Sequence, residues 1–267
     1  MHSSIPFHRR RGGAAGVLLV AVVAVAVIAI VFIAVARLQQ RTRVVTARPR
    51  ESTTQPRAAA PPESVPANAG PFAGCPVEGD GGDRALNRLK NREAARSLQE
   101  IQFDSVLGLP VPGEIRGRYR SRWPRRVTTE VASTERRAVR VEAYVARARL
   151  SGPESTNCHG DAAAYRDFHI WLTGAPTGDR TRSVIAEMTP RLRARHRGWE
   201  LNRLTDVSRR RERVRVGGWL LLDQEHPEQV GRTRGTIWEI HPVTSFEVFR
   251  GGRWVALDDI PLPRGGR

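Results

Sequence analysis

Two runs of sequence decide the expected fold, Arg213-Val-Arg-Val-Gly-Gly-Trp-Leu-Leu-Leu222 and Thr236-Ile-Trp-Glu-Ile-His-Pro242. The first run begins by alternating charged and apolar residues, which is the period-two pattern of a half-buried strand. Gly217 and Gly218 then interrupt the alternation, and we expect a β-bulge or a sharp bend there. A polar, proline-containing segment over residues 223–235 joins the two runs, so we predict two neighbouring strands.

Three more strands are predicted upstream, over residues 139–145, 167–172 and 183–190. The first two alternate in polarity, and the third ends at a proline. Residues 191–212 are mostly polar and are predicted to hold a short helix. Three strands, a helical connection and two strands form the element order of the OB-fold, a five-stranded Greek-key barrel. We therefore predict a mainly β fold with a small five-stranded OB-like barrel over residues 127–258, an order that other small β-barrels share.

The rest of the sequence divides by composition into five parts. They are a basic N-terminal tail (1–16), an apolar segment (17–36), a flexible linker rich in Pro, Ala and Arg (37–74), a helical and irregular appendage (75–126) and a C-terminal tail (259–267). The linker has almost no large apolar side chains, so burial cannot offset the entropy cost of ordering it. The apolar segment has twenty residues without a charge, and a helix of that length spans the roughly 30 Å hydrocarbon core of a membrane.

The apolar segment 17–36 fits either an uncleaved membrane anchor or a secretory signal, because Ala34-Val-Ala36 resembles a cleavage site. We favour the anchor, since the apolar run is longer than a usual signal core. The arginines that follow the segment favour a cytoplasmic C-terminal part, whereas the signal-like N-terminus and the Pro/Ala linker favour export. We expect a single-pass protein of the cell membrane whose C-terminal domain is extracytoplasmic.

The chain is strongly basic, with a formal net charge of +17, and Lys90 is its single lysine. Arginine suits bidentate recognition of phosphate, but a GC-rich genome also replaces lysine by arginine, and we prefer that explanation because the arginines are spread along the chain. An oligonucleotide binder would need exposed aromatic side chains, for which Tyr144, Trp171 and Trp238 are candidates. Tryptophans at alternating strand positions more often belong to a barrel core, so nucleic acid is a partner that we do not favour.

A set of histidines and glutamates is predicted to share one face of the strands. His169, Glu187, Glu239 and His241 are the candidate ligand-binding residues. If the strands approach one another, His159, His169 and His241 could hold a divalent metal ion such as zinc. The spacing matches no compact metal motif, however, and a hydrogen-bonded polar cluster without a metal is the simpler interpretation. We assign no catalytic residue from the sequence.

Cys75 and Cys158 are the two cysteines of the chain. In an exported domain they could form one disulfide that closes a long loop, which the chain-entropy model values at about 4 kcal/mol. Two unpaired thiols are the alternative. A thiol nucleophile activated by the adjacent His159 is disfavoured, because adjacent residues rarely point at each other.

Several short motifs together resemble a family of uncharacterised bacterial proteins that are small, secreted or membrane-anchored, and built on OB-like domains. The resemblance covers about residues 75–257 and implies the fold and the exported setting, without an activity. The motifs are Ala85-Leu-Asn-Arg-Leu-Lys-Asn-Arg92, Gly152-Pro-Glu-Ser-Thr-Asn-Cys-His159, Asp167-Phe-His169, Gly218-Trp-Leu-Leu-Leu-Asp-Gln-Glu-His-Pro227 and Gly235-Thr-Ile-Trp-Glu-Ile-His-Pro242.

These observations favour a membrane-anchored, exported β-barrel that works as a non-enzymatic binding or interaction module for an unknown protein or small ligand. The first alternative is a metal-dependent, nuclease-like hydrolase that uses the histidine and glutamate cluster. The second alternative is a binder of single-stranded oligonucleotides, which would show an affinity that falls steeply with salt.

Overall fold

The structure is a computed structural model that describes residues 74–115 and 117–261. The predicted basic tail, the apolar segment and almost all of the predicted linker lie outside the described residues, as does most of the C-terminal tail. In the described part of the chain, no helix is both long and apolar enough to cross a membrane.

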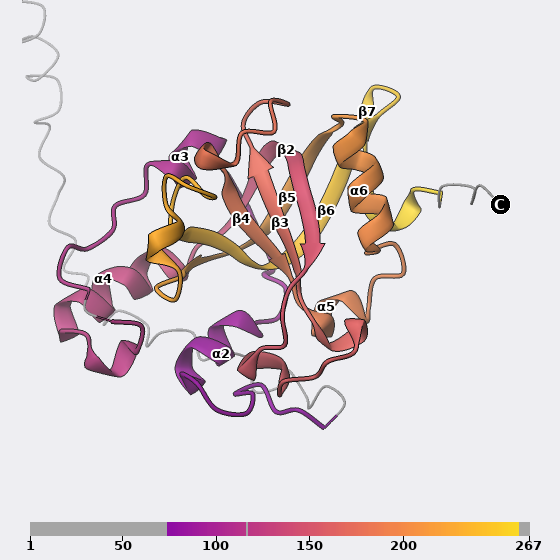
Figure 1. The fold of residues 1–267 in the computed structure, drawn as a ribbon. Helices are drawn as coiled ribbons and strands as arrows, with labels where there is room; N and C mark the ends of the chain where they lie inside the picture. Colours follow the sequence, from indigo (N-terminus) through magenta and orange to yellow (C-terminus); the bar gives the residue numbers. More distant parts are fainter. Residues whose placement is uncertain (1–73, 116, 262–267) are drawn as a thin grey trace, which may run out of the picture. The chain divides into compact units, whose positions relative to one another are not determined.

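Five strands close into a β-barrel (Figure 1). Each strand pairs with the next, and the last strand pairs back with the first; β4 and β6 run parallel, while the other four barrel pairings are antiparallel. The prediction of a mainly β fold with a closed five-stranded barrel is therefore confirmed. In their order around the barrel, the strands are β2 (Ala138–Leu150), β3 (Phe168–Thr173), β4 (Val184–Met188), β6 (Trp238–Arg250) and β5 (Arg213–Leu222).

Two further strands extend the sheet beyond the barrel. The short β1 (Gln99–Glu100) runs parallel to β2. The last strand, β7 (Arg253–Ala256), forms a hairpin with the end of β6. The turn of that hairpin consists of Gly251 and Gly252, both at positive φ, which glycine adopts without steric cost.

Short helices fill the connections, and three of the five α-helices described precede the barrel. The α-helices are α2 (Arg84–Lys90), α3 (Phe103–Leu107), α4 (Arg125–Glu135), α5 (Pro190–Arg193) and α6 (Leu201–Arg209). The short 3-10 helices are η1 (Arg120–Arg122), η2 (Ser155–Asn157), η3 (Ala163–Tyr165), η4 (Arg180–Arg182), η5 (Pro227–Gln229) and η6 (Leu257–Asp259). Helices α5 and α6 lie between β4 and β5, where the sequence predicts a helical connection.

The N-terminal edge of the barrel differs from the sequence expectation. We expected the barrel domain to begin near residue 127 with its first strand over residues 139–145; the first barrel strand does start at Ala138, but residues 125–135 form α4, which was not predicted. The reason is the spacing of Val127 and Val131, which places both on one helical face that is buried against the barrel. Residues 104–126, expected to be irregular, contain most of α3 and all of η1.

Gly217 and Gly218 form a β-bulge in β5, as predicted. The register between β5 and β6 shifts at Gly217 and Gly218, which marks the bulge. A Cβ atom on Gly218 would lie 2.3 Å from the carbonyl oxygen of Pro242, so no larger residue fits there. The bulge thus lets β5 pass close to the segment of β6 that carries His241.

Strand alternation separates an apolar interior from a polar exterior. Ile170 of β3, Ala186 of β4 and Ile240 of β6 belong to the buried hydrophobic core. Because successive side chains point to opposite faces, the neighbouring residues His169 and Glu187 lie on the outer face. That outer face is not solvated at this point, since the segment around α2 lies against this part of the barrel (Figure 1).

Cys75 and Cys158 form a disulfide that ties this covering segment to the connection between β2 and β3. The two cysteines are 83 residues apart in sequence, a loop length worth about 4.5 kcal/mol in the chain-entropy model. The disulfide therefore fixes the cover over one face of the barrel.

Candidate functional site

Five ionisable side chains meet on the covered outer face of β3, β4 and β6. His169 and Glu187 are direct register partners on β3 and β4. On the other side of β4, Ile185 pairs with Glu239 of the parallel strand β6. Alternation then places His241 beside Glu187, and Asp167, two residues before His169, on the same side. We call Asp167, His169, Glu187, Glu239 and His241 the acid–imidazole cluster; each residue is at most 7% exposed.

The cluster is a continuous set of short contacts centred on His241. Its Nδ1 lies 3.3 Å from Glu187 Oε2 and 3.6 Å from Glu239 Oε2, while its Nε2 lies 3.8 Å from Asp167 Oδ2. On the other side of Glu187, Oε1 is 2.7 Å from His169 Nδ1. Asn157 from η2 donates a 2.8 Å hydrogen bond to Asp167 Oδ1. Glu187 thus bridges the two imidazoles.

Several polar atoms of the cluster have no hydrogen-bond partner among the described residues. They include both ring nitrogens of His241, Nε2 of His169 and Oδ2 of Asp167. Buried polar atoms in folded proteins are nearly always hydrogen-bonded, and leaving one unpaired costs roughly 1 to 3 kcal/mol. Four unpaired polar atoms within one buried cluster indicate a site that could still form hydrogen bonds or coordinate bonds to a ligand.

Two buried cations lie at the edge of the cluster, Lys90 from α2 and Arg234 from the connection between β5 and β6. Lys90, the last residue of α2, lies 3.3 Å from Glu154 and 3.2 Å from Glu225. Arg234 binds Asp223 at 2.8 Å and Glu239 at 2.7 Å through the same terminal nitrogen. The single lysine of the chain is therefore placed at this site, although the sequence analysis gave it no role.

The end of the covering segment is also fixed to the barrel backbone. Arg92 donates hydrogen bonds to the carbonyl oxygens of Glu135 at 2.6 Å, Leu220 at 3.0 Å and His241 at 3.3 Å. These bonds cross from the cover to α4, β5 and β6. They hold the backbone of His241 in place from outside the barrel.

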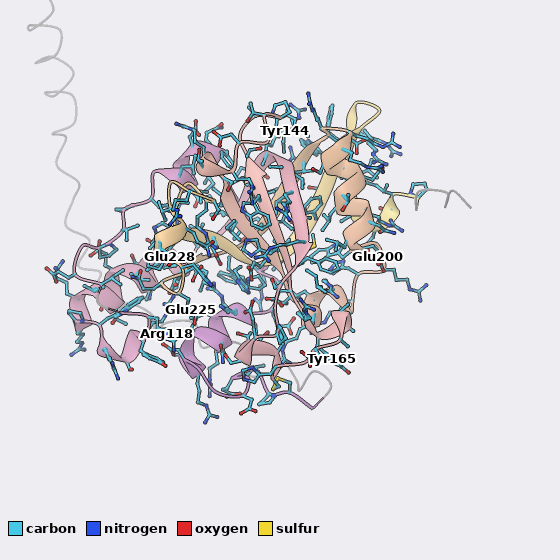
Figure 2. The ribbon with its side chains drawn as sticks, viewed as in Figure 1. Arg118, Tyr144, Tyr165, Glu200, Glu225 and Glu228 are labelled. Carbon is cyan, nitrogen blue, oxygen red and sulfur yellow. A yellow bond between two sulfur atoms is a disulfide. The ribbon has the colours of Figure 1, made fainter. Side chains whose placement is uncertain are left out.

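A polar cleft of about 510 Å³ opens above the cluster. His169, Glu187 and Glu239 line it, whereas His241 and Asp167 are fully buried beneath its floor. Six acidic and four basic residues line the cleft, in a chain whose net charge is +17. Figure 2 labels two of the lining residues, Arg118 and Glu225, beside α2.

Burial shifts the cluster toward its uncharged forms. Loss of hydration raises the pKa of Asp167 and of Glu187 well above the usual carboxyl range, and raises that of Glu239 to about 7. The same loss lowers the pKa of His169 to about 4 and that of His241 to about 3. Neutral imidazole nitrogens and carboxyl groups that give up a proton are the forms in which these side chains bind metal ions.

The groups around the cluster are shifted toward their charged forms instead. Burial opposes the ionisation of Asp223, but a hydrogen bond from His226 and the charge of Arg234 hold its pKa well below its usual range. That hydrogen bond, 2.9 Å long, raises the pKa of His226 to about 9. Burial also opposes the charge on Lys90, and the nearby Glu154 and Glu225 raise its pKa well above the ordinary value. The site therefore has a neutral centre inside a charged border.

One subset of the cluster has the spacing of a metal site. Asp167, Glu187 and His241 each offer a ligand atom, and these atoms lie within 4.8 Å of one another. Metal–ligand bonds of about 2.0 to 2.2 Å place the ligands of one ion roughly 3 to 4 Å apart, so the three need only a small contraction to hold one. A carboxylate pair with one imidazole suits zinc or another borderline divalent ion.

The structure brings together four of the sequence-predicted site residues and leaves one apart. His169, Glu187, Glu239 and His241 lie in the cluster. His159 lies at the exposed edge of the cleft, with Nε2 3.0 Å from the carbonyl oxygen of Asp80, and it is not among the three residues with metal-site spacing.

Asp167 precedes His169 by two positions, so strand alternation predicts it on the same face. Lys90 and Arg234 were not predicted to belong to this site. For Lys90, its being the only lysine was the available signal. Arg234 carried no signal, because it stands in a connection among many arginines.

The aromatic side chains considered for oligonucleotide stacking are not exposed. Trp238 is 1% exposed and belongs to the core, and Trp171 is 4% exposed. Tyr144 is half-buried. Neither tryptophan offers an open ring face of the kind on which bases stack.

No family model, no curated protein and no solved structure matches this chain. The family resemblance suggested by the sequence motifs therefore stays a prediction, and the site has to be interpreted from its own geometry.

Proposed function

We propose that the barrel is of the OB type. The order of its strands, the parallel pairing of the third barrel strand with the fifth, and the closure of the fourth onto the first support this assignment. Helices α5 and α6 occupy the connection between the third and fourth barrel strands, as they would in that fold.

We further propose that the chain is a divalent-metal-dependent hydrolase whose metal is held by Asp167, Glu187 and His241. The observation that carries this proposal is the fully buried imidazole of His241, whose two nitrogens face carboxylates at 3.3 to 3.8 Å without a hydrogen bond. A purely structural histidine at this depth would normally have its nitrogens paired. A cation held by Asp167, Glu187 and one ring nitrogen of His241 would supply a partner that the described residues do not provide.

The chemistry that fits this arrangement is attack by water. A bound divalent ion would supply an activated water at neutral pH. His169 lines the cleft with Nε2 unpaired, while its Nδ1 is held by Glu187 at 2.7 Å. It is therefore positioned to accept a proton from a water molecule in the cleft. Arg234 keeps Glu239 in place beside Nδ1 of His241, the nitrogen that Glu187 also approaches.

The proposed setting is the outer side of the cell membrane, with residues 17–36 as the anchor. The disulfide between Cys75 and Cys158 supports this setting, because such bonds persist in oxidising compartments. In that location the cleft would meet substrates outside the cytoplasm.

The test is hydrolysis of an activated ester by the metal-stripped full-length chain after addition of zinc, manganese or magnesium. We expect activity that depends on one of these ions and falls by about 100-fold or more in Glu187→Gln. The matched control is Glu142→Gln, which changes an exposed glutamate on a neighbouring barrel strand and should keep full activity.

Two results would overturn the hydrolase proposal. One is metal-independent hydrolysis that is equal in Glu187→Gln and the wild type. The other is metal binding without turnover of any ester, which would favour a metal-containing binding module, the use first expected from the sequence.

A further inference from the structure

We infer that the substrate of this site is a phosphodiester, bound through Arg118 and Arg149 at the mouth of the cleft. This inference rests on the proposed hydrolytic function and names its substrate class. Among the four basic residues that line the cleft, Lys90 and Arg234 are paired with carboxylates. Within the described part of the chain, Arg118 and Arg149 have no carboxylate partner, which leaves their guanidinium groups available to an anion.

Arg149 is placed directly beside the cluster. It is the register partner of His169 across β2 and β3, so their side chains share the outer face of the barrel. Its guanidinium also lies 5.4 Å from the centre of the Trp171 ring, which in turn packs at 4.3 Å from the ring of His169. An anion held by Arg149 would therefore lie next to His169.

Arg118 approaches the same cleft from the connection between α3 and η1. It lies near Tyr119, with its guanidinium 5.1 Å from the ring centre and a 3.2 Å hydrogen bond to the hydroxyl. Arg118, Tyr119 and Glu225 all line the cleft, and Figure 2 labels Arg118 and Glu225. The aromatic contact orients the guanidinium without neutralising it.

The charge layout of the cleft favours a phosphodiester over a neutral ester. Two guanidinium groups without a carboxylate partner line the cleft, together with the protonated imidazole of His226, which is paired with Asp223. Guanidinium forks match the oxygen spacing of phosphate and bind it through paired hydrogen bonds. A metal ion held by Asp167, Glu187 and His241 would add positive charge close to the phosphoryl oxygens of such a substrate.

The reaction would add one water across one P–O ester bond. The water oxygen bonds to phosphorus as the ester P–O bond breaks and its electron pair stays on the leaving oxygen. The proton released by the water passes to His169 Nε2 and then to the leaving oxygen. The products are a phosphomonoester and an alcohol, and no oxidant, reductant or further reactant is needed.

The experiment compares bis(p-nitrophenyl) phosphate, which is anionic, with p-nitrophenyl acetate, which is neutral, on the metal-loaded full-length chain. We expect Arg149→Gln and Arg118→Gln to raise KM for the phosphodiester roughly tenfold or more, with less than about a twofold change for the acetate. The control is Arg147→Gln, since Arg147 lies 5.7 Å from the same Trp171 ring but does not line the cleft. Equal effects of all three variants, or equal effects on both esters, would overturn the inference.

A second measurement separates this inference from the hydrolase proposal. If the metal-loaded chain hydrolyses neither ester, the hydrolase proposal fails, and calorimetry with inorganic phosphate tests the anion site alone. Weaker phosphate binding by Arg149→Gln than by Arg147→Gln supports the site, and equal binding contradicts it. If hydrolysis is found, a dinucleotide and glycerophosphocholine as competing inhibitors decide whether the phosphodiester comes from nucleic acid or lipid.

Discussion

Two parts of the barrel's outer surface both carry ionisable side chains, but these side chains are solvated and paired on one part and buried on the other. On β2 and β5, Glu142 pairs with Arg215 at 3.0 Å and with Arg213 at 3.7 Å, and Glu142 is 45% exposed. On β3, β4 and β6, the acid–imidazole cluster is buried and incompletely hydrogen-bonded. Charges on the first surface are neutralised by neighbours and water, whereas the second surface lacks partners for several polar atoms.

The difference lies in what covers each surface. The covering segment and the connections after β2 and β5 lie over the cluster, and the disulfide and Arg92 hold that cover in place. Strand alternation is the same on both surfaces, so it determines which way a side chain points but not whether water reaches it. An ionisable residue on the outer face of a strand therefore indicates a functional site only where another segment of the chain packs over it and excludes water.

The largest expected effect comes from removing a buried cation. Arg234→Met leaves Glu239 and Asp223 buried without their shared partner, which should lower the free energy of unfolding by about 3 to 5 kcal/mol. The same change at the exposed surface, Arg215→Met, should cost about 1 kcal/mol or less. Urea denaturation of both variants measures the contrast. Equal losses would show that the two surfaces do not differ as described.

The disulfide comes next. Replacing Cys75 and Cys158 by serine should lower the free energy of unfolding by about 2 to 4 kcal/mol. The effect should also be local, because the bond tethers the cover rather than the barrel. Hydrogen exchange should therefore speed up in α2 and η2 much more than in β2 and β5. Uniform loss of protection over the whole barrel would contradict a separate role for the cover.

A smaller effect concerns His226 and pH. Its pKa is raised to about 9 in the folded chain, above the value of about 6.5 expected in the unfolded chain. The stabilisation by its charged form is therefore complete below about pH 6.5 and is lost as the pH rises through about 9. His226→Gln should be less stable than the wild type at pH 6, by about 1 kcal/mol or less because the side chain is half exposed. The gap should close at pH 10, and a gap that stays constant would contradict the assignment.

Local sequence patterns predict the barrel well because they determine strand faces directly. Alternation locates the strands, and the pairing of His169 with Glu187 follows once the strands are in order. The metal trio is harder to predict, since Asp167 precedes β3 and is positioned by Asn157 from η2. Its depth depends on the cover, whose Pro-, Gly- and Arg-rich sequence has no periodicity that could reveal its contacts with the barrel.

The measurement that tests the central claim most directly is the number of divalent ions bound by the full-length chain. The metal-stripped chain is titrated with zinc and with manganese by calorimetry, and the bound metal is counted by elemental analysis. The wild type and Glu142→Gln should each bind about one ion, and Glu187→Gln should bind none. Glu187→Gln should fold normally, since burial already favours the uncharged form of that side chain. Absence of a bound ion in the wild type, or equal binding by Glu187→Gln, would contradict the claim.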